Sequence, residues 1–581
     1  MDYATINKPP VEQFKVRPNL DDYDGIRARF HYPDVIQELD GLPGGGLNIG
    51  YEAIDRHLKH GGAERLCWIW ESKDGRTETY TYADAARLSN QFANVLGKLG
   101  IVKGDRVFCF MDRVPELYAA VFGTLKAGCV TGPLFSAFGP DAAGDRIRDA
   151  GATVLVTTPE QRHKVDAMRP TLPDLKHIII VDHGKEPVLQ AGELSWNTLM
   201  ADASDAFEIV HTGPEDPAVM HFTSGTTGKS KGAVHVHQAV LGHYATGKYV
   251  LDLHRDDDIY WCTADPGWVT GTSYGMFAPH TNGVTSVIYE GGFSASKWYE
   301  VIQKHKVTVW YTAPTAIRLL MKAGDELPKR YDLSSLRYMM SVGEPLNPEA
   351  VVWADRAIGL PFHDNWWQTE TGSIMIANYP LLPIKPGSMG KPMPGIEPGV
   401  IDEQGNVLPP GEEGDLAVRP GWPSMFRTYW NNEEMYNSKF KNGWYITGDR
   451  ARMDADGYYW FVGRSDDVIN TAGHLVGPFE VESALIEHPA VAEAGVIGKP
   501  DPVAMEIVKA FVTLKDGFEQ SEQLRRELLQ FSRQKLGPGV APREIDFIDV
   551  LPKTRSGKIM RRLLKARELG LPEGNTDTLE D

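Results

Sequence analysis

Short apolar runs alternate with amphipathic stretches over residues 75–345. The run "GDRVFCFM" precedes the helix-like stretch "PELYAAVFGTLKAG", which is followed by the second strand-like run "CVTGPLF". Strand-length apolar runs separated by helical or turn segments are typical of β-α-β units. Further strand-like runs are "ATVLVTT", "KHIIIVD", "PAVMHFT", "VTSVIYE", "VTVWYTA" and "LRYMMSVG". The pattern predicts an α/β fold with mostly parallel sheets covered by helices, whose ligands gather at the carboxyl ends of the strands.

The amino-acid composition and the predicted secondary structure change twice in the second half of the chain. Residues 385–415 are rich in Pro and Gly, as in "KPGSMGKPMPGIEPG", which predicts turns and a smaller β-rich subdomain. After Gly463 the chain carries a charged helix-like stretch, "SEQLRRELLQFSRQKLG", between β-rich runs. This predicts a compact α+β domain. We place the boundary at Asp466, which gives an N-terminal domain over 1–465 and a C-terminal domain over 466–581.

Composition and charge exclude several classes of protein. The formal net charge of −18 argues against nucleic-acid binding, because phosphate backbones are bound by clustered Lys and Arg. The start lacks the apolar core of a signal peptide, and no run of 18 or more apolar residues occurs, which predicts a cytoplasmic protein without a membrane span. The four cysteines form no C-x-x-C pair, so we expect buried free thiols rather than a zinc or redox site.

One stretch, "HFTSGTTGKSKGAVH" (221–235), suggests phosphate chemistry. Its centre looks like the end of the P-loop pattern G-x-x-x-x-G-K-[ST], but Thr223 stands where the leading glycine should be. Backbone N–H groups, hydroxyls and the charges of Lys229 and Lys231 would suit a phosphate chain, although composition alone fits a surface turn equally well. The residues predicted to bind phosphate are Thr223, Ser224, Gly225, Thr226, Thr227, Gly228 and Lys229.

Other motifs follow this loop in a fixed order. They are "YTAPTAIR" (311–318), "SVGEP" (341–345), "DNWWQTETG" (364–372), "YITGDRARMDADGYYWFVGRSDD" (445–467) and "PKTRSGKIMRR" (552–562). Together they resemble the adenylate-forming superfamily. The double tryptophan and the run "WCTADPGWVTGTSYG" (261–275) are most similar to the acetyl-CoA synthetases within it.

The resemblance implies a fold and a reaction. The fold is a large domain of two helix-covered, mostly parallel sheets with a small β-barrel-like subdomain, followed by the small α+β domain. The enzyme would be an AMP-forming acetate–CoA ligase: acetate reacts with ATP to give acetyl-AMP and pyrophosphate, and coenzyme A then takes the acetyl group. The implied cofactors are ATP, Mg²⁺ and coenzyme A.

The resemblance also assigns roles to residues at the nucleotide. Lys558 would reach the α-phosphate during adenylation and Glu370 would hold Mg²⁺, which makes these two the catalytic residues. Asp449 would accept both ribose hydroxyls, with Arg464 nearby. The remaining ATP-binding residues would be Gly343, Glu344, Pro345, Asp364, Asn365, Trp366, Trp367, Gln368 and Thr369.

Further roles concern the two other substrates and the movement between steps. Trp367 would close the acyl pocket, because an indole leaves room for a very short alkyl chain only. The other walls would be Trp268, Val269, Thr270 and Val342. Coenzyme A would meet Arg146, Arg148, Thr270, Gly473 and Arg533. Asp466 would be the hinge on which the small domain rotates between the two steps. A cation site is matched at Ile486, His488 and Val491.

The resemblance further implies that a lysine acetyltransferase and a deacetylase act on Lys558. One position departs from the family. Acetyl-CoA synthetases carry an arginine two residues after the glycine of "NTAG", whereas this chain has Leu475, which cannot bind phosphate. Alternatives therefore remain: the same reaction on propionate or a short branched acid, or a non-catalytic adenylate-binding protein. The presence of Lys558, Glu370 and Asp449 argues against the last.

Overall fold

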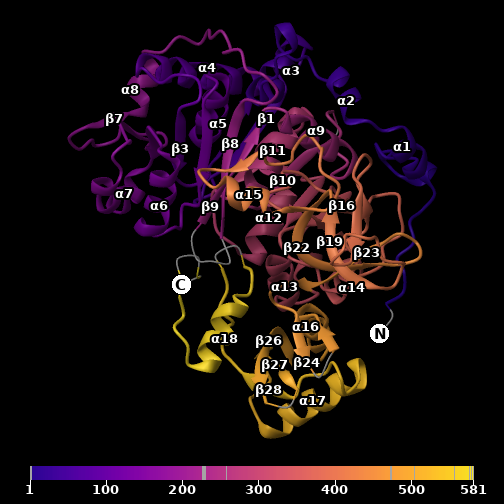
Figure 1. The fold of residues 1–581 in the computed structure, drawn as a ribbon. Helices are drawn as coiled ribbons and strands as arrows, with labels where there is room; N and C mark the ends of the chain where they lie inside the picture. The colour runs from indigo at the N-terminus through magenta and orange to yellow at the C-terminus, as the bar shows by residue number, and fades with distance from the viewer. Residues whose placement is uncertain are drawn as a thin grey trace.

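The computed structural model describes residues 3–224, 230–256, 258–471, 474–502, 504–554, 557–574, 576 and 579, with the backbone alone at 224, 474 and 475. The chain forms a large body and a smaller lobe that carries the C-terminal segment (Figure 1). Within these residues no helix is both long and apolar enough to cross a membrane. The four cysteines are free, and three of them are buried, as the sequence predicts.

Two sheets form the centre of the large body. The first has eight strands, in the order β20 (Thr428–Tyr429), β9 (Ser230–Val236), β8 (Pro217–Ser224), β4 (Val130–Leu134), β3 (Arg106–Phe110), β5 (Val154–Thr157), β6 (His177–Ile180) and β7 (Glu193–Ser195). The second has seven, in the order β14 (Phe362–His363), β13 (Tyr338–Ser341), β12 (Val309–Thr312), β10 (Ile259–Cys262), β11 (Thr285–Tyr289), β1 (Leu66–Glu71) and β2 (Thr77–Thr81). Only the pairs β8–β9, β9–β20 and β1–β2 are antiparallel, so the predicted mostly parallel sheets are confirmed.

Successive side chains of a strand point to opposite faces of the sheet, and here both faces are buried, which explains why the strand sequences are apolar at successive positions. In β3, Val107 and Cys109 face the core between the two sheets, while Phe108 and Phe110 face a second core on the outer side. A strand buried on both faces needs apolar side chains at every position, which is typical of parallel sheets. The strands that the sequence predicted most clearly are of this kind.

Helices cover both sheets (Figure 1). The longest, α4, starts with a capping box in which Thr81 and Asp84 each bond the other's backbone N–H. The α-helices of the large body are α1 (Tyr23–Arg29), α2 (Tyr32–Val35), α3 (Arg56–Lys59), α4 (Tyr82–Lys98), α5 (Pro115–Lys126), α6 (Pro140–Ala150), α7 (Arg162–Met168), α8 (Trp196–Ala201), α9 (Ala239–Tyr249), α10 (Val269–Thr272), α11 (Ala278–Thr281), α12 (Ala295–His305), α13 (Pro314–Lys322), α14 (Pro348–Ala357) and α15 (Glu433–Asn437).

The predicted β-rich subdomain is an antiparallel sheet. Its strands are β18 (Pro398–Ile401), β19 (Glu413–Val418), β22 (Trp444–Met453), β21 (Phe440–Lys441) and β23 (Tyr459–Arg464). In the part of the chain that the structure describes, the pairings run from β18 to β21, β23 also pairs with β22, and an isolated bridge between Gly390 and Tyr459 links β23 to the residue before β17. A barrel-like arrangement of this subdomain stays a prediction. A three-stranded sheet, β15 (Asn365–Trp366), β16 (Ile376–Ala377) and β17 (Lys391–Pro392), lies after β14 in sequence.

The small lobe has its own sheet and core. Its elements are β24 (Ile469–Thr471), β25 (His474–Val476), α16 (Pro478–Ile486), β26 (Val491–Asp501), β27 (Met505–Leu514), α17 (Glu522–Leu536), β28 (Glu544–Phe547) and α18 (Arg561–Leu569). Val496, Val508 and Leu528 belong to its core, which is separate from those of the large body. This confirms a small α+β domain, while the boundary at Asp466 stays a prediction. Asp466 lies in the turn between β23 and β24.

Candidate functional site

The predicted phosphate loop joins β8 to β9. These strands pair antiparallel, with Thr223 opposite Lys231 and Ser224 opposite Ser230. β8 also pairs in parallel with β4, so the loop lies at a carboxyl strand end, as predicted. A P-loop would lead into a helix, whereas this loop leads into another strand, which agrees with the missing glycine. The predicted residues Gly225, Thr226, Thr227, Gly228 and Lys229 lie outside the described residues.

The loop after β13 and the start of the "DNWWQTETG" segment meet at the end of the second sheet. The buried Asp364 accepts a hydrogen bond from the Ser341 hydroxyl at 2.6 Å and one from the Leu346 N–H at 3.2 Å. Burial raises the pKa of Asp364 to about 7. Asn365 donates to the Ser341 carbonyl at 2.6 Å. The loop that holds Gly343, Glu344 and Pro345 is thus fixed against Asp364, and Gly343 has a φ of 99°, which favours glycine.

Asp449 lies at the centre of the candidate nucleotide site. Its carboxylate accepts from the Trp366 indole N–H at 3.0 Å and from the Gln368 amide at 2.9 Å. Arg464 stands opposite it on the neighbouring strand, because β22 and β23 pair these two positions. Burial raises the pKa of Asp449, while Arg464 acts to lower it. The carboxylate is therefore oriented by two donors, and a ribose hydroxyl would add a third.

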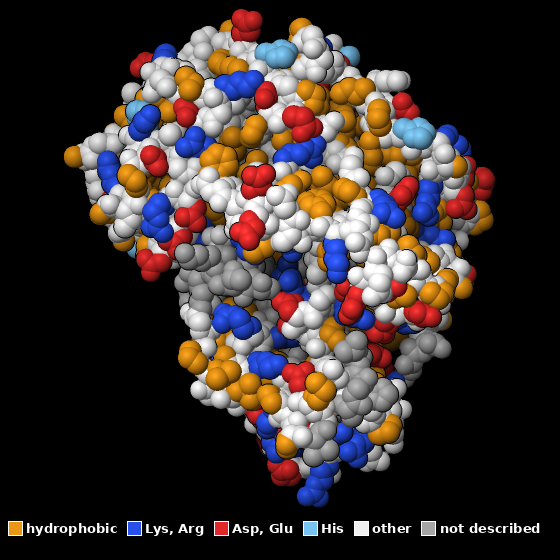
Figure 2. All heavy atoms as spheres, in the orientation of Figure 1, with side chains coloured by type: hydrophobic (Ala, Val, Ile, Leu, Met, Phe, Trp, Pro, Cys, Tyr) orange, Lys and Arg blue, Asp and Glu red, His pale blue; other side chains and the backbone are white. Residues whose placement is uncertain are grey.

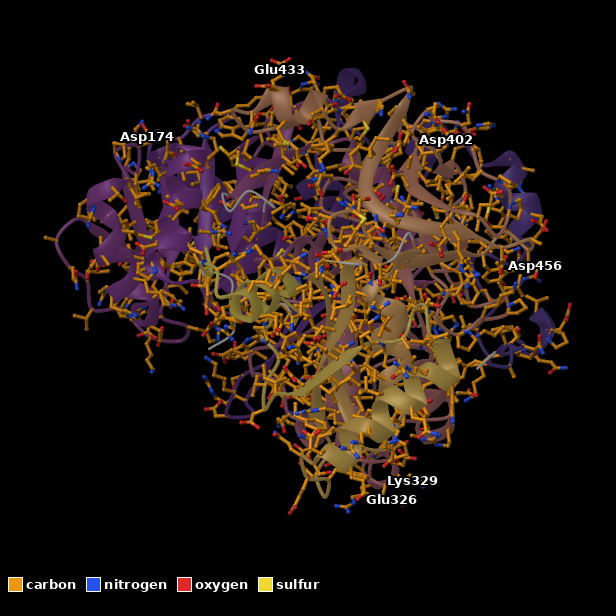
Figure 3. All side chains as sticks on the ribbon, turned by 60° about the horizontal axis from the view of Figure 1, so that its bottom comes forward. Asp174, Glu326, Lys329, Asp402, Glu433 and Asp456 are labelled. Atoms are coloured by element: carbon orange, nitrogen blue, oxygen red, sulfur yellow. The ribbon has the colours of Figure 1, made fainter. Side chains whose placement is uncertain are left out.

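Glu370 interacts electrostatically with two lysines near this point. Glu370 accepts a hydrogen bond from the Tyr429 hydroxyl at 2.7 Å. Its charge raises the pKa of both Lys231 and Lys558, although burial lowers the pKa of each lysine overall. Figure 2 shows Lys and Arg side chains in the hollow between the large body and the small lobe. By contrast, the acidic residues labelled in Figure 3 lie around the rim of the molecule.

Lys558 is a residue of the small lobe, but the carboxylates that act on its charge are in the large body. Burial lowers its pKa, and the carboxylates of Glu344, Asp449 and Glu370 each raise it. Although the Lys558 side chain as a whole is exposed, nearby protein atoms desolvate its ammonium group. The predicted catalytic lysine thus interacts electrostatically with three of the predicted site residues, while its contact with a phosphate stays a prediction.

A single carboxylate such as Glu370 fits the chemistry of Mg²⁺, which takes one or two protein carboxylates together with phosphate oxygens and water. Within the described residues, no group of three or more His, Cys, Asp or Glu side chains could hold a metal ion by itself. The donor set thus fits a cation that arrives with a nucleotide. At the predicted cation site after α16, the His488 Nδ1 accepts from the Ala490 N–H at 3.2 Å and its Nε2 faces Glu527 at 3.2 Å. A cation at His488 stays a prediction.

The predicted acyl pocket is brought together only in part. The Trp367 ring contacts the Tyr274 ring edge-on, with the centroids 5.0 Å apart, and packs against the core that contains Val342. Val269 and Thr270 begin α10 and are half-buried. Trp268 lies elsewhere: its ring packs on Phe135 and Phe138, in the outer core of the first sheet. The structure therefore does not place Trp268 beside Trp367.

The predicted coenzyme A residues are dispersed. Arg146 is 5% exposed, with its guanidinium 4.3 Å from the centre of the Phe138 ring, so it does not present a cation to solvent here. It shares one face of α6 with Ala142, Ala143, Ile147 and Ala150, and this helical spacing could have predicted its burial. Arg148 is exposed and pairs with Asp145. Arg533 lies on α17, at the far end of the small lobe from α6 (Figure 1). Gly473 lies outside the described residues, as does the side chain of Leu475.

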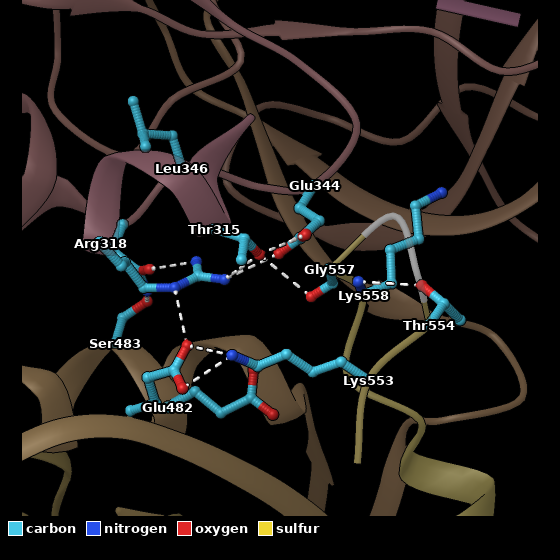
Figure 4. Close-up of polar contacts among 12 residues, drawn as sticks. Thr315, Arg318, Glu344, Leu346, Glu482, Ser483, Lys553, Thr554, Gly557 and Lys558 are labelled. Atoms are coloured by element: carbon cyan, nitrogen blue, oxygen red, sulfur yellow. Dashed lines mark hydrogen bonds and ion pairs between the residues drawn. The ribbon is translucent and has the colours of Figure 1, made fainter. Parts of the chain in front are cut away.

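Some residues of the site were not assigned a role from the sequence, although Tyr311, Thr315 and Arg318 lie in the motif "YTAPTAIR". Tyr429 reaches Glu370 from β20, 59 positions along the chain. Tyr311 donates to Asn365 at 3.2 Å. Thr315 contacts Gly557 of the small lobe next to Lys558 (Figure 4), and Arg318 pairs with Glu493 of the same lobe. Contacts between residues so far apart in the chain cannot be predicted from local sequence patterns, because each side chain by itself is an ordinary polar residue.

Comparison with known proteins identifies the class to which this architecture belongs. Residues 55–430 match the AMP-binding enzyme family and residues 480–558 match the C-terminal domain of AMP-binding enzymes. The chain belongs to this family of adenylate-forming enzymes. It is 51% identical to the acetyl-coenzyme A synthetase of Bacillus subtilis, over 97% of this chain and 98% of that protein. It is 43% identical to the acetyl-coenzyme A synthetase of Deinococcus radiodurans, over 93% and 86% of the two chains.

Solved structures agree with this assignment. An acyl-CoA synthetase from Brucella canis superposes with a TM-score of 0.75 at 38% identity, covering 95% of this chain and 99% of that one. An anthranilate CoA ligase in complex with anthranoyl-AMP superposes with a TM-score of 0.84 at 32% identity, covering 93% and 99%. The resemblance to the adenylate-forming superfamily and its acetyl-CoA synthetases is confirmed.

The environment of Asp449 leads to a first prediction. Replacing Asp449 with asparagine should weaken ATP binding about tenfold or more, because the new amide group would face the donors of Trp366 and Gln368 and could no longer accept from both as well as from a ribose. Titration with ATP followed by intrinsic tryptophan fluorescence measures the change. An unchanged affinity, in a variant with the parent melting temperature, would remove Asp449 from the nucleotide site.

Proposed function

We propose that this chain is an AMP-forming acetate–CoA ligase. The observation that supports the proposal is the contact between Gly557, the neighbour of Lys558, and Thr315, which also contacts Glu344 of the large body. The charges of Glu344, Asp449 and Glu370 act on the Lys558 ammonium group and raise its pKa against the lowering by burial. The substrate follows from the relatives, which are acetyl-coenzyme A synthetases along nearly the whole chain. The chemistry is then activation of a carboxylate on ATP, followed by transfer to the thiol of coenzyme A.

The first half-reaction creates a good leaving group. An acetate oxygen attacks the α-phosphorus of ATP, the bond to the β-phosphate oxygen breaks, and pyrophosphate departs. The developing charge lies on the α-phosphoryl oxygens, where a fixed cation stabilises the transition state more than the ground state. Lys558 is the cation available there. Asp449 would fix the ribose, and the loop at 223–229 would hold the leaving pyrophosphate.

Glu370 would hold Mg²⁺, which when bound neutralises phosphate charge. Tyr429 keeps the Glu370 carboxylate oriented by donating a hydrogen bond at 2.7 Å. Lys231 lies above the Tyr429 ring, 5.8 Å from its centre, and contributes charge on the same side. A pocket lined in part by Ser230, Lys231 and Trp430 adjoins this loop.

In the second half-reaction the thiol sulfur of coenzyme A attacks the acyl carbon, its proton passes to solvent, and the bond to the AMP phosphate oxygen breaks. We propose that the small lobe rotates about Asp466 between the steps, so that Lys558 leaves and Gly473 faces the thiol. Arg148 and Arg533 are exposed and could then reach phosphates of coenzyme A. Acetylation of Lys558 by a lysine acetyltransferase, reversed by a deacetylase, would remove its charge and stop adenylation. A cytoplasmic location also stays a prediction.

A panel of acids tests the proposal. Acetate should give the highest kcat/KM, propionate less, and butyrate and isobutyrate at least about tenfold less than acetate, because extra methylenes beside Trp367 overpack the site at about 1–3 kcal/mol. Pyrophosphate release measures each rate. Preference for propionate or isobutyrate would favour the same reaction on that acid, and no release with any acid would contradict an enzymatic function.

A further inference from the structure

A chain of charged groups crosses between the two lobes beside the catalytic loop. Arg318, on α13 of the large body, contacts the Glu344 carboxylate at 2.9 Å on one side and the Glu493 carboxylate at 3.6 Å on the other. Glu493, on β26 of the small lobe, in turn accepts from the Lys553 ammonium at 2.7 and 2.8 Å. Figure 4 shows Arg318 directed between Glu344 and the small lobe.

All four side chains of this interlobe chain are largely shielded from water. Their exposed fractions are 10% for Arg318, 11% for Glu344, 18% for Glu493 and 10% for Lys553. Charges alternate along it, so each is compensated by a neighbour of opposite sign. Shielded pairs of this kind are much more sensitive to the loss of one partner than exposed surface pairs, because the remaining charge stays desolvated.

The catalytic loop has a second attachment next to Lys558. The Thr315 hydroxyl, one turn before Arg318 on α13, lies 3.0 Å from the Gly557 carbonyl oxygen and 2.9 Å from Glu344. The approach is so close that a Cβ at Gly557 would stand 2.5 Å from the Thr315 hydroxyl oxygen. The loop is therefore held to α13 at both ends, at Lys553 through Glu493 and directly at Gly557.

Two of these contacts cross between the lobes, Arg318 with Glu493 and Thr315 with Gly557. The contacts of Glu344 lie within the large body, and the pair of Glu493 with Lys553 lies within the small lobe. Any rotation of the small lobe that removes Lys558 from Asp449 must also separate Arg318 from Glu493 and Thr315 from Gly557. The contacts thus exist in one of the two orientations required by the proposed function. The contacts stabilise that orientation only and therefore shift the equilibrium between the two orientations toward it.

We propose that Glu493 and Lys553 are positioning residues for adenylation, which act by docking the small lobe on Arg318 and so hold Lys558 at the nucleotide. The inference rests on the proposed function. Glu493 and Lys553 act through Lys558 and are distinct from the catalytic residues. Their loss should lower the share of molecules in the adenylating orientation and leave the thioester-forming orientation intact.

The test measures the two half-reactions separately in the full-length enzyme. Glu493→Gln keeps the shape of the side chain and removes its charge, and Lys553→Met removes the partner cation. Both should slow acetate-dependent exchange of labelled pyrophosphate into ATP about tenfold, which corresponds to 1.4 kcal/mol of lost docking. Formation of acetyl-CoA from supplied acetyl-adenylate should be unchanged or faster. Lys553→Arg, whose guanidinium can bind the Glu493 carboxylate, should restore most of the exchange rate.

Lys499→Met is the matched control. It removes two ion pairs within the small lobe, with Glu544 at 2.8 Å and with Glu568 at 3.0 Å, and should change neither half-reaction. An equal loss of both half-reactions in Glu493→Gln, or no loss of exchange in either variant, would overturn the inference. A wild-type enzyme that performs neither half-reaction would instead contradict the proposed function, so the two failures are distinguishable.

Discussion

Replacing Lys558 with methionine is expected to slow formation of acetyl-adenylate about 10²- to 10³-fold, the range found when one preorganised donor to a developing charge is removed. The reason is electrostatic: the carboxylates of Glu344, Asp449 and Glu370 act on the Lys558 ammonium group, which by the proposed mechanism meets the α-phosphate. Methionine preserves much of the length of the side chain without its charge. Pyrophosphate exchange with acetate measures the effect directly.

The same variant should retain the second half-reaction, since Lys558 has no role once the adenylate exists. Supplied acetyl-adenylate and coenzyme A should give acetyl-CoA at close to the parent rate. Lys565→Met is a suitable control, because Lys565 lies on α18 just beyond the motif and pairs with Glu506 at 2.8 Å within the small lobe. If Lys558→Met and Lys565→Met lowered exchange equally, Lys558 would be a structural lysine and the mechanism would need another cation.

Strands that are buried on both faces of a sheet were predictable from the sequence. Runs such as 106–110 and 309–312 are apolar at successive positions because both faces of each strand are covered, and local composition records this directly. Local composition does not predict a contact such as that of Arg318 with Glu493, because these residues lie 175 positions apart and each is a charged residue on a largely apolar element. Charge partners across lobes depend on tertiary geometry, which no local pattern encodes.

For the site residues, the family resemblance predicted which residues take part better than it predicted what surrounds their side chains. It selected Lys558, Asp449 and Glu370, which the structure places in one electrostatic group. It also selected Arg146 and Trp268, whose side chains pack against aromatic rings away from those residues. Motif positions fix the backbone location of a residue, whereas the rotamer and its neighbours depend on the packing of other segments, such as Phe138 against both side chains.

The second large effect concerns the choice of acid. Replacing Trp367 with glycine should raise the ratio of kcat/KM for pentanoate to that for acetate about 10²- to 10³-fold. Each methylene newly buried in the vacated space contributes about 0.8 kcal/mol, or roughly 60-fold for three methylenes, and relief of overpacking adds to this. Acetate itself should be used less well, because the indole no longer packs beside its methyl group. Pyrophosphate release across an acid series from two to six carbons measures the ratio.

Trp268→Gly supplies the matched control, because it removes an indole that the sequence predicted in the same pocket, 99 residues earlier in the chain. The Trp268 ring packs on Phe135 and Phe138, while the Trp367 ring meets Tyr274, so only the second should shift chain-length preference. Both variants lose aromatic packing and should melt at a lower temperature. A change in acid preference that occurs in only one of them is therefore not caused by the loss of stability. A shift in preference for Trp268→Gly without one for Trp367→Gly would move the acyl group to the outer face of the first sheet. It would also remove the physical basis for acetate as the preferred acid.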